Sequence, residues 1–481
     1  MRINHLHLRN FKGFEDSQFD FPRSADAPGS SGSFHLLIGR NATGKTSALD
    51  ALAVAAGAWF LGVPEAVSRT IRGEDIRVKV IDFGDTQRIE RQLPVIVTVK
   101  GEAMGQSIHW QRILAWSRTD TAGAKSLKRV AKRVVAAVRE GRRETLPLIV
   151  YYGTGRSWQE PRSPVRPKMT RAEIAAIRTS MMKNRKPAGS NGQLATALPD
   201  PPQPVNEDDE PDDLADDFAS SLAGYRDSLD PRCSPRQLLR WLKFEQQLAV
   251  QDRRESIQFQ VVKDAIRQSV AGCISVNYHL RLGLLLDIEG QQRLPFSALS
   301  HGQRNMVAMI GDMAYRAAQL NPHLGAEVLA KTPGIVLIDE LELHLHPRWQ
   351  RRVVQDLQGL FPEVQFFAST HSPQIVGHLP PRWLHLLQRD QAGQIVQVPV
   401  SQSLGMDSNW ILEQIMDTPE RESATGDRLS AVFDVIDEGD YTKARARIRD
   451  IEDQVGLFPE LQGAKSMLDR LEMLAGDEED R

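Results

Sequence analysis

Residues 39–46 of this chain, GRNATGKT, have the types and spacing of a loop that binds phosphate groups. They fit the pattern G-x-x-x-x-G-K-[ST], in which backbone N–H groups wrap phosphate oxygens and a following helix points its positive end at them. Lys45 is expected to reach the β- and γ-phosphates, and the Thr46 hydroxyl to ligate Mg²⁺. The nucleotide-binding residues predicted here are Gly39, Asn41, Gly44, Lys45, Thr46 and Ser47. The alternative is a chance match, which a preceding strand and a following helix weigh against.

Two adjacent carboxylates, Asp339 and Glu340, directly follow the apolar run Gly334–Ile338. A buried strand that ends in Asp-Glu places one carboxylate near a metal and the other near an attacking water. We expect Asp339 to hold Mg²⁺, directly or through water, and Glu340 to orient or deprotonate the water. The alternative is a solvated strand end without a catalytic role.

Two further segments carry candidate residues. Ser300 precedes a helix-like stretch, so it is expected to cap that helix and create an anion site, although an ordinary helix cap is the simpler interpretation. Residues 366–373, FFASTHSP, read as a strand that ends in Ser-Thr-His. Ligands bind at the carboxyl edge of such sheets, so His371 is a candidate contact for the γ-phosphate, with a purely structural histidine as the alternative.

The elements that position these residues are predicted from periodicity and length. Paired strands are expected over 3–8 and 17–21, and strand-like runs over 34–38, 76–113, 148–152, 280–288, 334–338 and 364–369. Helices are expected from Lys45 to about Phe60, over 125–143 with one basic face, and over 238–271, 303–320 and 348–360. The chain is predicted to be helical after about residue 404.

Size and composition set limits on the class of protein. A chain of 481 residues is long enough for two or three domains, and a net charge of -2 predicts neither nucleic-acid nor membrane binding. Two cysteines without metal-ligand spacing favour a reducing cytoplasm, and no apolar stretch reaches membrane-spanning length. Residues 160–217 are first basic, then proline-rich, then acidic, which predicts a flexible insertion with one short helix near 170–182.

The order of these motifs resembles a known family. The P-loop, Leu-Ser-x-Gly-Gln at 299–303, Asp-Glu and Ser-Thr-His are similar to the ABC-type ATPase heads of the SMC, RecF and OLD group. The resemblance implies that two heads sandwich two ATP molecules, that Ser300, Gly302 and Gln303 act in trans, and that His371 is the switch histidine. Residues 8–14, LRNFKGF, look like the segment beside adenine and ribose, which implies binding roles for Arg9, Asn10 and Lys12.

The sequence also differs from that group in several places. His346 stands where the D-loop aspartate usually lies, and the turn after Tyr152, near Arg156 and Gln159, is our hypothesis for the Q-loop. The region after His371 lacks the Glu…Asp-x-Asp set of OLD nucleases, so no nuclease is expected in this chain. SMC and RecN proteins insert long heptad arms, whereas the segment between Trp158 and Ser297 is too short and proline-interrupted for one.

Three segments point to one particular group within this family. They are LIVYYGTGRSW at 148–158, LSHGQRNMVAM at 299–309 and GIVLIDELELHLHPRWQ at 334–350. They look like the ATPase subunit of Septu antiphage systems and the ATPases attached to some retrons. This implies an ATPase of bacterial defence that regulates a separate HNH nuclease through nucleotide-dependent head association. The expected cofactors are ATP and Mg²⁺. The expected partners are a second copy, in a dimer or higher oligomer, the nuclease, and DNA or retron nucleic acid, with no membrane.

The predicted fold is α/β, an ABC-type P-loop head with a mixed sheet, an antiparallel β subdomain, an inserted helical region and a helical C-terminal tail. The expected parts are an N-terminal half of the head over 1–158, a charged insertion over 159–219, a helical and strand subdomain over 220–296, the C-terminal half over 297–400, and the tail over 401–481. A RecF-like repair ATPase that binds DNA through helix 125–143 or the insertion is the alternative function. A nucleotide-gated scaffold with negligible turnover is the third.

Overall fold

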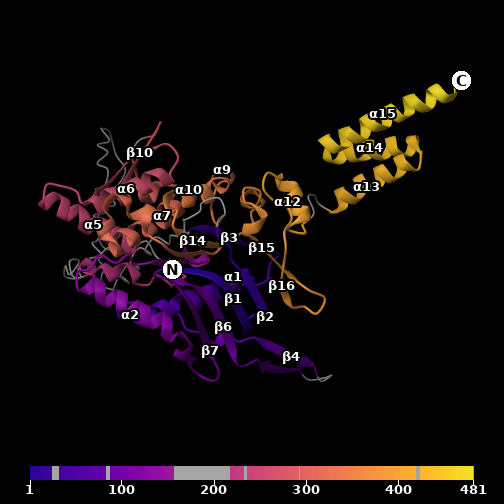
Figure 1. The fold of residues 1–481 in the computed structure, drawn as a ribbon. Helices are drawn as coiled ribbons and strands as arrows, with labels where there is room; N and C mark the ends of the chain where they lie inside the picture. The colour runs from indigo at the N-terminus through magenta and orange to yellow at the C-terminus, as the bar shows by residue number, and fades with distance from the viewer. Residues whose placement is uncertain are drawn as a thin grey trace, which may run out of the picture. The chain divides into compact units, whose positions relative to one another are not determined.

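The computed structural model describes residues 1–23, 32–82, 87–156, 217–231, 236–291, 293–418 and 423–479 (Figure 1). Nearly all of the predicted insertion, its short helix and Gln159 therefore lie outside the described residues. The chain divides into two compact units. The first holds Met1–Ile375 and Arg382–Pro399, and the second holds Val376–Pro381 and Val400–Arg481.

A six-stranded mixed sheet forms the centre of the first unit. Its strands run in the order β16 (Ile395–Val398), β15 (Leu384–Arg389), β3 (Ser33–Ile38), β14 (Val364–Ser369), β13 (Gly334–Ile338) and β9 (Leu148–Tyr152). The five strands from β15 to β9 are parallel, and β16 pairs antiparallel with β15. Sequence from both ends of the chain thus builds one sheet. Because parallel strands end at one edge, the segments after β3, β13 and β14 meet there.

A five-stranded antiparallel sheet lies on the other side of helix α1 (Lys45–Ala56). Its order is β2 (Phe14–Asp20), β1 (Arg2–Phe11), β6 (Val95–Ala103), β7 (Gln106–Leu114) and β8 (Thr119–Asp120). Helix α1 contacts β13 and β14 of the mixed sheet and β1, β6 and β7 of the antiparallel sheet, so it is buried except at Thr46 and Ser47 in its first turn. A separate hairpin, β4 (Val78–Asp82) and β5 (Gln87–Arg91), extends from this layer.

Helix α1 ends earlier than the sequence suggested. It stops at Ala56, and a 3-10 helix, η1 (Gly57–Gly62), continues toward Phe60. Gly57 lies against the backbone of the returning chain, since a Cβ there would be 3.0 Å from the Arg69 nitrogen, and its carbonyl accepts a bond from Ser68 Oγ at 2.7 Å. This close approach fixes the end of the regular helix.

A helical layer covers the β9 edge of the mixed sheet. It contains α5 (Arg236–Gln251), α6 (Ile257–Ser269), α7 (His301–Leu320), α8 (Val328–Lys331) and a 3-10 turn, η5 (Ser221–Tyr225), with α7 packed against α5, α6, η5 and β9. A small sheet of β10 (Cys273–His279), β11 (Gly283–Ile288) and β12 (Leu294–Pro295) adjoins it. The predicted strand over 280–288 begins only at Gly283, whose φ of 72° belongs to the preceding turn.

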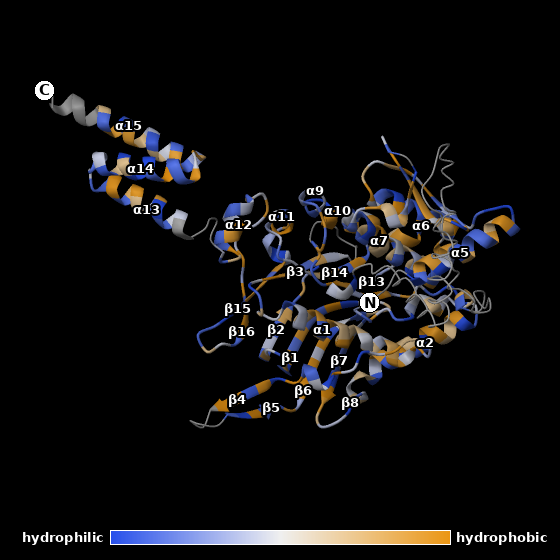
Figure 2. Ribbon diagram, turned by 180° about the vertical axis from the view of Figure 1, so that it is seen from behind, coloured by the Kyte–Doolittle hydropathy of each residue, from blue (hydrophilic) through white to orange (hydrophobic). Residues whose placement is uncertain are grey.

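Helix α2 (Lys125–Arg139) packs its apolar side on η1 and β7. Both hydrophobic and hydrophilic residues lie along it (Figure 2), and its buried residues, Leu127, Val130, Ala131, Val134, Val135 and Ala137, form the apolar face that the sequence predicted. The helix predicted over 348–360 is instead two, α9 (Pro347–Gln350) and α10 (Val353–Leu360). Arg351 and Arg352 form a turn between them, and Arg352 is the N-cap of α10, with a φ of -112°.

The second unit is helical, with α12 (Ser408–Gln414), α13 (Ser423–Asp437), α14 (Tyr441–Val455) and α15 (Pro459–Glu479). Helices α13 to α15 share a core of their own, formed by Val432, Val435, Ile436, Ala444, Ile448, Ile451, Leu461, Ala464 and Leu468. The predictions of the α/β fold class and of a helical C-terminal tail are confirmed. In the described parts of the chain, no helix has both the length and the apolar character needed to cross a membrane.

Candidate nucleotide-binding site

The P-loop connects β3 to α1, and two of its glycines are required by close packing. Gly39 has a φ of 141° and Gly44 a φ of 91°, a region that favours glycine. A Cβ on Gly39 would lie 2.3 Å from the Leu387 carbonyl oxygen. A Cβ on Gly44 would lie 2.9 Å from Ile395 Cδ1 and 3.0 Å from Phe14 Cζ. The loop is therefore seated between β15, β16 and the β1–β2 turn, with the first N–H groups of α1 at its end.

Lys45 lies inside this loop. Its Nζ donates to the carbonyl oxygens of Gly39 at 2.7 Å and of Arg40 at 2.9 Å. Burial lowers the pKa of Lys45, while the nearby carboxylates of Asp339, Glu342 and Glu340 act to raise it. The ammonium is thus held where a bound triphosphate would offer better acceptors than two loop carbonyls. Of the other predicted contacts, Asn41 is exposed on the loop and Ser47 is half-buried in the first turn of α1.

Thr46 and Asp339 meet at the edge of the sheet. Thr46 Oγ1 lies 2.9 Å from Asp339 Oδ2 and 3.2 Å from Oδ1, although 293 residues separate the two in sequence. Ser369, the last residue of β14, donates from its hydroxyl to Asp339 Oδ1 at 2.5 Å. A hydroxyl and an oriented carboxylate side by side are oxygen ligands of the kind Mg²⁺ takes in nucleotide sites, where it needs only one or two protein ligands besides phosphates.

The backbone of Glu340 is held in an unusual conformation. Its φ is 49°, its N–H donates to Ser369 Oγ at 2.8 Å, and its carbonyl accepts from Arg156 Nη2 at 2.7 Å. Arg156 Nη1 also donates to the Asp339 carbonyl, and burial lowers the pKa of this guanidinium to about 10. A left-handed conformation at a non-glycine residue persists only where neighbours fix it. Ser369 and Arg156 supply that restraint, which directs the Glu340 side chain.

His371 follows β14 and is tied to the Asp-Glu segment through Glu342. The backbone N–H of His371 donates to Glu342 Oε1 at 2.6 Å, and Thr370 Oγ1 donates to Glu342 Oε2 at 2.6 Å. The His371 side chain is exposed at the sheet edge. Its backbone position is therefore fixed while its ring faces solvent beside the P-loop edge of the sheet.

Ser300, Gly302 and Gln303 lie at the start of α7, on a different part of the unit. Ser300 Oγ accepts from the Gln303 N–H at 3.2 Å and the Gln303 side chain accepts from the Ser300 N–H at 3.0 Å, so the predicted helix cap is confirmed as a capping box. A Cβ on Gly302 would lie 2.5 Å from the His344 carbonyl oxygen, which shows how closely the two segments approach. Together they line a cavity of about 1080 Å³ with His301, His344, Leu345, His346, Arg348 and Trp349.

The segment implied for adenine and ribose makes contacts within the protein. Arg9 is exposed, and the Asn10 amide donates to the Pro94 carbonyl at 3.0 Å. Lys12 Nζ lies 2.5 Å from Asp50 Oδ2 and 3.4 Å from Asp75 Oδ1. The same turn lies against the P-loop through Phe14. Lys12 is thus engaged with α1 in the described structure, and the nucleotide contacts of all three residues stay predictions.

Sequence reasoning missed several residues of this site. Glu342 was not singled out, although it is the second acidic residue after Asp339 in an alternating run. Asp50 was missed as well, and it joins α1 to Lys12, to Arg69 at 2.5 Å and to the Tyr151 hydroxyl at 3.3 Å. Arg156 was named only for the Q-loop hypothesis. One signal in the sequence could have found them. Each is a charged residue within an apolar helix or shortly after a buried strand, and a buried charge needs a partner.

This combination is a P-loop at the carboxyl edge of the parallel strands, with Glu340 directly after Asp339, the candidate metal ligand. Two family models match the chain. One, described as AAA domain, putative AbiEii toxin, Type IV TA system, covers residues 168–377, and another, described as AAA domain, covers residues 5–230. The chain therefore carries AAA-type ATPase domains, and it is homologous to retron ATPases and to Septu protein PtuA.

The curated relatives match in part of their length. Retron Vc95 probable ATPase of Vibrio cholerae serotype O1 biovar El Tor is 31% identical over 180 residues, which are 37% of this chain and 34% of that protein. Retron Ec83 probable ATPase of Escherichia coli is 36% identical over 140 residues, 29% of this chain and 24% of that protein. Septu protein PtuA of Bacillus mycoides (strain KBAB4) is 40% identical over 75 residues, 16% of this chain and 10% of that protein. The matches thus span about a third or less of these relatives.

Among solved structures, the SMC head domain from Thermotoga maritima is similar to 84% of this chain over its full length, with 14% identity and a TM-score of 0.38. The SmcHead bound to the C-winged helix domain of ScpA is similar to 83% of this chain and 98% of its own, with 14% identity and a TM-score of 0.43.

Proposed function

We propose that this chain binds ATP with Mg²⁺ and hydrolyses it. The observation that carries the proposal is the contact between Thr46 of the P-loop and Asp339 at the end of β13, at 2.9 Å. It joins the phosphate-binding loop to an oriented carboxylate at the edge where the parallel strands end. The metal, held by Thr46 and Asp339, would neutralise charge on the β- and γ-phosphates.

The residues then have separate roles. Backbone N–H groups of residues 39–47 and the Lys45 ammonium bind the phosphates, and Lys45 exchanges its loop carbonyls for phosphate oxygens. Glu340 orients the attacking water and accepts its proton, while the γ-phosphoryl group passes to that water and ADP leaves. His371 contacts the γ-phosphate from the end of β14. Ser369, Arg156 and Glu342 hold these groups in position through the contacts described above.

The site is completed by a second copy of the chain. Ser300, Gly302 and Gln303 lie at a helix N-terminus beside a cavity of about 1080 Å³; Ser300 is exposed, Gln303 is half-buried and Gly302 is buried. Such an N-terminus presents N–H groups to an anion. In our proposal it contacts the γ-phosphate held by the partner copy, so that ATP joins two heads and hydrolysis separates them.

The biological role follows from the relatives. The homologous chains are named as ATPases of retrons and as a Septu protein, which supports a bacterial defence ATPase that works in the cytoplasm. In this proposal, ATP-dependent association of the heads regulates a separate HNH-type nuclease, and the nuclease active site is on that partner. Retron nucleic acid or DNA is a further candidate partner.

A RecF-like ATPase that binds DNA directly is a second candidate, and one observation favours it. Helix α2 exposes Lys125, Arg129, Lys132 and Arg133 along its outer side, beside a cavity of about 460 Å³ that Arg129, Arg133 and His109 line. Tight binding of duplex DNA by the isolated chain, with a steep loss of affinity as salt rises, would support this candidate. Co-purification of an HNH protein encoded beside it would support the defence role.

The direct experiment uses Glu340→Gln. This variant is expected to release phosphate about 10²–10⁴-fold more slowly than the parent while it binds ATP and remains associated. The rate of hydrolysis is measured by phosphate release, and ATP binding by the retention of labelled ATP after gel filtration. Association of the copies is measured by the particle mass with and without ATP. Glu438→Gln, an exposed change on the second unit, is the matched control. If Glu340→Gln retains ATP no longer than the parent, the catalytic assignment is wrong.

A further inference from the structure

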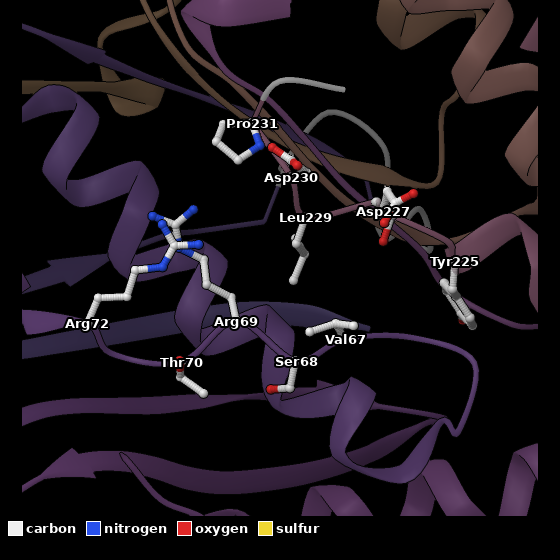
Figure 3. A pocket seen from close by; sticks show the side chains of 11 residues that line it. Val67, Ser68, Arg69, Thr70, Arg72, Tyr225, Asp227, Leu229, Asp230 and Pro231 are labelled. Atoms are coloured by element: carbon white, nitrogen blue, oxygen red, sulfur yellow. The ribbon is translucent and has the colours of Figure 1, made fainter. Parts of the chain in front are cut away.

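A third cavity lies outside the P-loop, the Asp339–Glu340 segment and the start of α7. Its volume is about 500 Å³, and its walls come from two segments, 67–72 and 225–231 (Figure 3). The first segment brings Arg69 and Arg72, whose guanidinium groups point into the same space in the close-up view. The second brings Ser228 and Asp227. The volume is in the range of small-molecule sites.

Arg69 has more hydrogen-bond donors than the protein satisfies. Its side chain is 6% exposed, and only Nη2 is paired, with Asp50 Oδ1 at 2.5 Å. Its guanidinium also lies over the Tyr151 ring, 5.6 Å from the ring centroid, but its buried Nε and Nη1 atoms have no hydrogen-bond partner in the described structure. Buried donors of a charged group are nearly always satisfied, so two vacant donors on one guanidinium call for an acceptor.

Two other side chains near the cavity, Ser228 and Arg112, also have polar atoms without a hydrogen-bond partner. The hydroxyl of Ser228, a residue 1% exposed, has no hydrogen-bond partner in the described structure. Arg112 lies behind the first segment, donates to Ser68 Oγ at 3.1 Å, and keeps Nε and Nη2 unpaired. Three guanidinium groups thus gather around residues 68–72. An anion with several acceptor oxygens in the cavity would supply the acceptors that the Arg69 donors lack.

We propose that this cavity binds the phosphate group of a small phosphorylated molecule. Arg69 and Arg72 would hold the phosphate oxygens, and Ser228 would donate a further hydrogen bond. Asp227, exposed on the opposite wall, would accept from donors at the other end of a ligand such as a 5′-mononucleotide. Because Arg69 pairs with Asp50 of α1, a ligand here and a nucleotide at the P-loop act on the same helix.

The site is tested with the full chain carrying Lys45→Ala and Thr46→Ala, so that the P-loop contributes no phosphate binding. The probes are inorganic phosphate and dCMP, measured by isothermal titration calorimetry. We expect saturable binding of at least one probe. Adding Arg72→Gln should weaken it about tenfold, and adding Ser228→Ala about threefold, in line with lost charged and neutral hydrogen bonds. Both substitutions avoid the Asp50 ion pair, so the fold is retained.

Arg142→Gln is the matched control, because Arg142 is exposed and paired with Glu140, and it should leave the affinity unchanged. Asp227→Asn separates the two sources of phosphate. Tighter binding of dCMP than of phosphate, lost in Asp227→Asn, identifies a nucleotide, whereas equal binding that strengthens in Asp227→Asn identifies phosphate itself. Binding of neither probe, or binding that Arg72→Gln leaves unchanged, overturns the proposal. The ATPase assignment is measured on the chain with an intact P-loop and is independent of this result.

Discussion

Arg156 Nη2 lies 2.7 Å from the carbonyl oxygen of Glu340, a residue 184 positions further along the chain. Its Nη1 donates to the carbonyl of Asp339, so one buried guanidinium holds two consecutive carbonyls after β13. The planar fork of arginine is what allows both bonds at once. The side chains that we assign to the metal and to the water are therefore fixed through their backbone by a residue from the end of another strand.

Arg156→Lys tests this restraint. A lysine ammonium cannot reproduce the two parallel bonds, so the left-handed backbone of Glu340 loses one of its supports. We expect the turnover number to fall about tenfold while ATP affinity changes less than about threefold, because the P-loop is untouched. Steady-state phosphate release measures the turnover number, and ATP titration measures the affinity. Arg142→Lys, on the surface, should change neither. A loss confined to ATP affinity would contradict a positioning role.

Gly44→Ala tests the packing of the P-loop. The added Cβ would lie 2.9 Å from Ile395 Cδ1 and 3.0 Å from Phe14 Cζ, at a φ of 91°. We expect ATP affinity to fall by about tenfold or more, since each 1.4 kcal/mol of strain on the binding conformation costs that factor. Gly105→Ala is the control, because its φ of 72° is also positive but no atom lies within 4 Å of the new Cβ. Equal effects on ATP affinity would show that packing at Gly44 is unimportant.

The ion pairs beneath α1 give a prediction about stability. Asp50 is 9% exposed and pairs with Lys12 and Arg69, so Asp50→Asn leaves Arg69 without its carboxylate and leaves Lys12 only Asp75, at 3.4 Å. Breaking a buried pair in this way costs about 3–5 kcal/mol, which a urea titration of the unfolding free energy would measure. Asp16→Asn removes the exposed partner of His7 and should cost less than about 1 kcal/mol. Similar costs for both variants would mean that the Asp50 pairs are already screened by water.

The motifs of this site were predictable from the sequence, but their restraints were not. The P-loop and the run that ends in Asp339 have fixed local spacing, and a buried strand precedes each of them, so local pattern was enough. Glu342, Arg156 and Asp50 act through partners that are distant in sequence, and nothing in their own neighbourhood names those partners. The end of α1 at Gly57 depends on tertiary packing, and the turn at Arg351 and Arg352 separates α9 from α10; hydrophobic periodicity reports neither.

Two buried histidines predict a dependence of stability on pH. His35 Nδ1 lies 3.2 Å from His385 Nε2, and Ser33, Gln397 and the Arg2 guanidinium surround the pair. Burial lowers the pKa of His385 from 6.5 to about 4, although the hydrogen bond with Gln397 and the charge of Asp20 act to raise it. Burial, with His385 and Arg2 nearby, also lowers the pKa of His35. The unfolded chain takes up protons below pH 6.5 while the folded chain does not. The free energy of unfolding should therefore decrease from pH 6.5 down to about 4.

For His385 alone the loss approaches about 3 kcal/mol at the acid end, at 1.36 kcal/mol per pKa unit. Chemical denaturation at pH 7, 6, 5 and 4 measures the slope. His385→Gln keeps a hydrogen-bonding group and should flatten that slope, whereas His109→Gln, on the edge of a surface cavity, should leave it unchanged. An unaltered slope in His385→Gln would assign the acid sensitivity to other groups.

The proposed sharing of sites between two copies gives a prediction that a single-copy enzyme does not share. Lys45→Ala disables the phosphate-binding loop, and Ser300→Arg places a bulky cation at the helix that would face the partner's ATP. Each variant alone should lose at least about 90% of the turnover, because every site contains one defective half.

Mixed in equal amounts, the two variants form hybrid pairs in which one site combines the intact loop of one copy with the intact Ser300 of the other. We expect the mixture to recover up to about a quarter of the parent turnover, since about half of the pairs are hybrids with one working site each. Phosphate release from the mixture, compared with the sum of the separate variants, measures this. A mixture that is no more active than that sum would mean that Ser300 does not act on the ATP of a second copy.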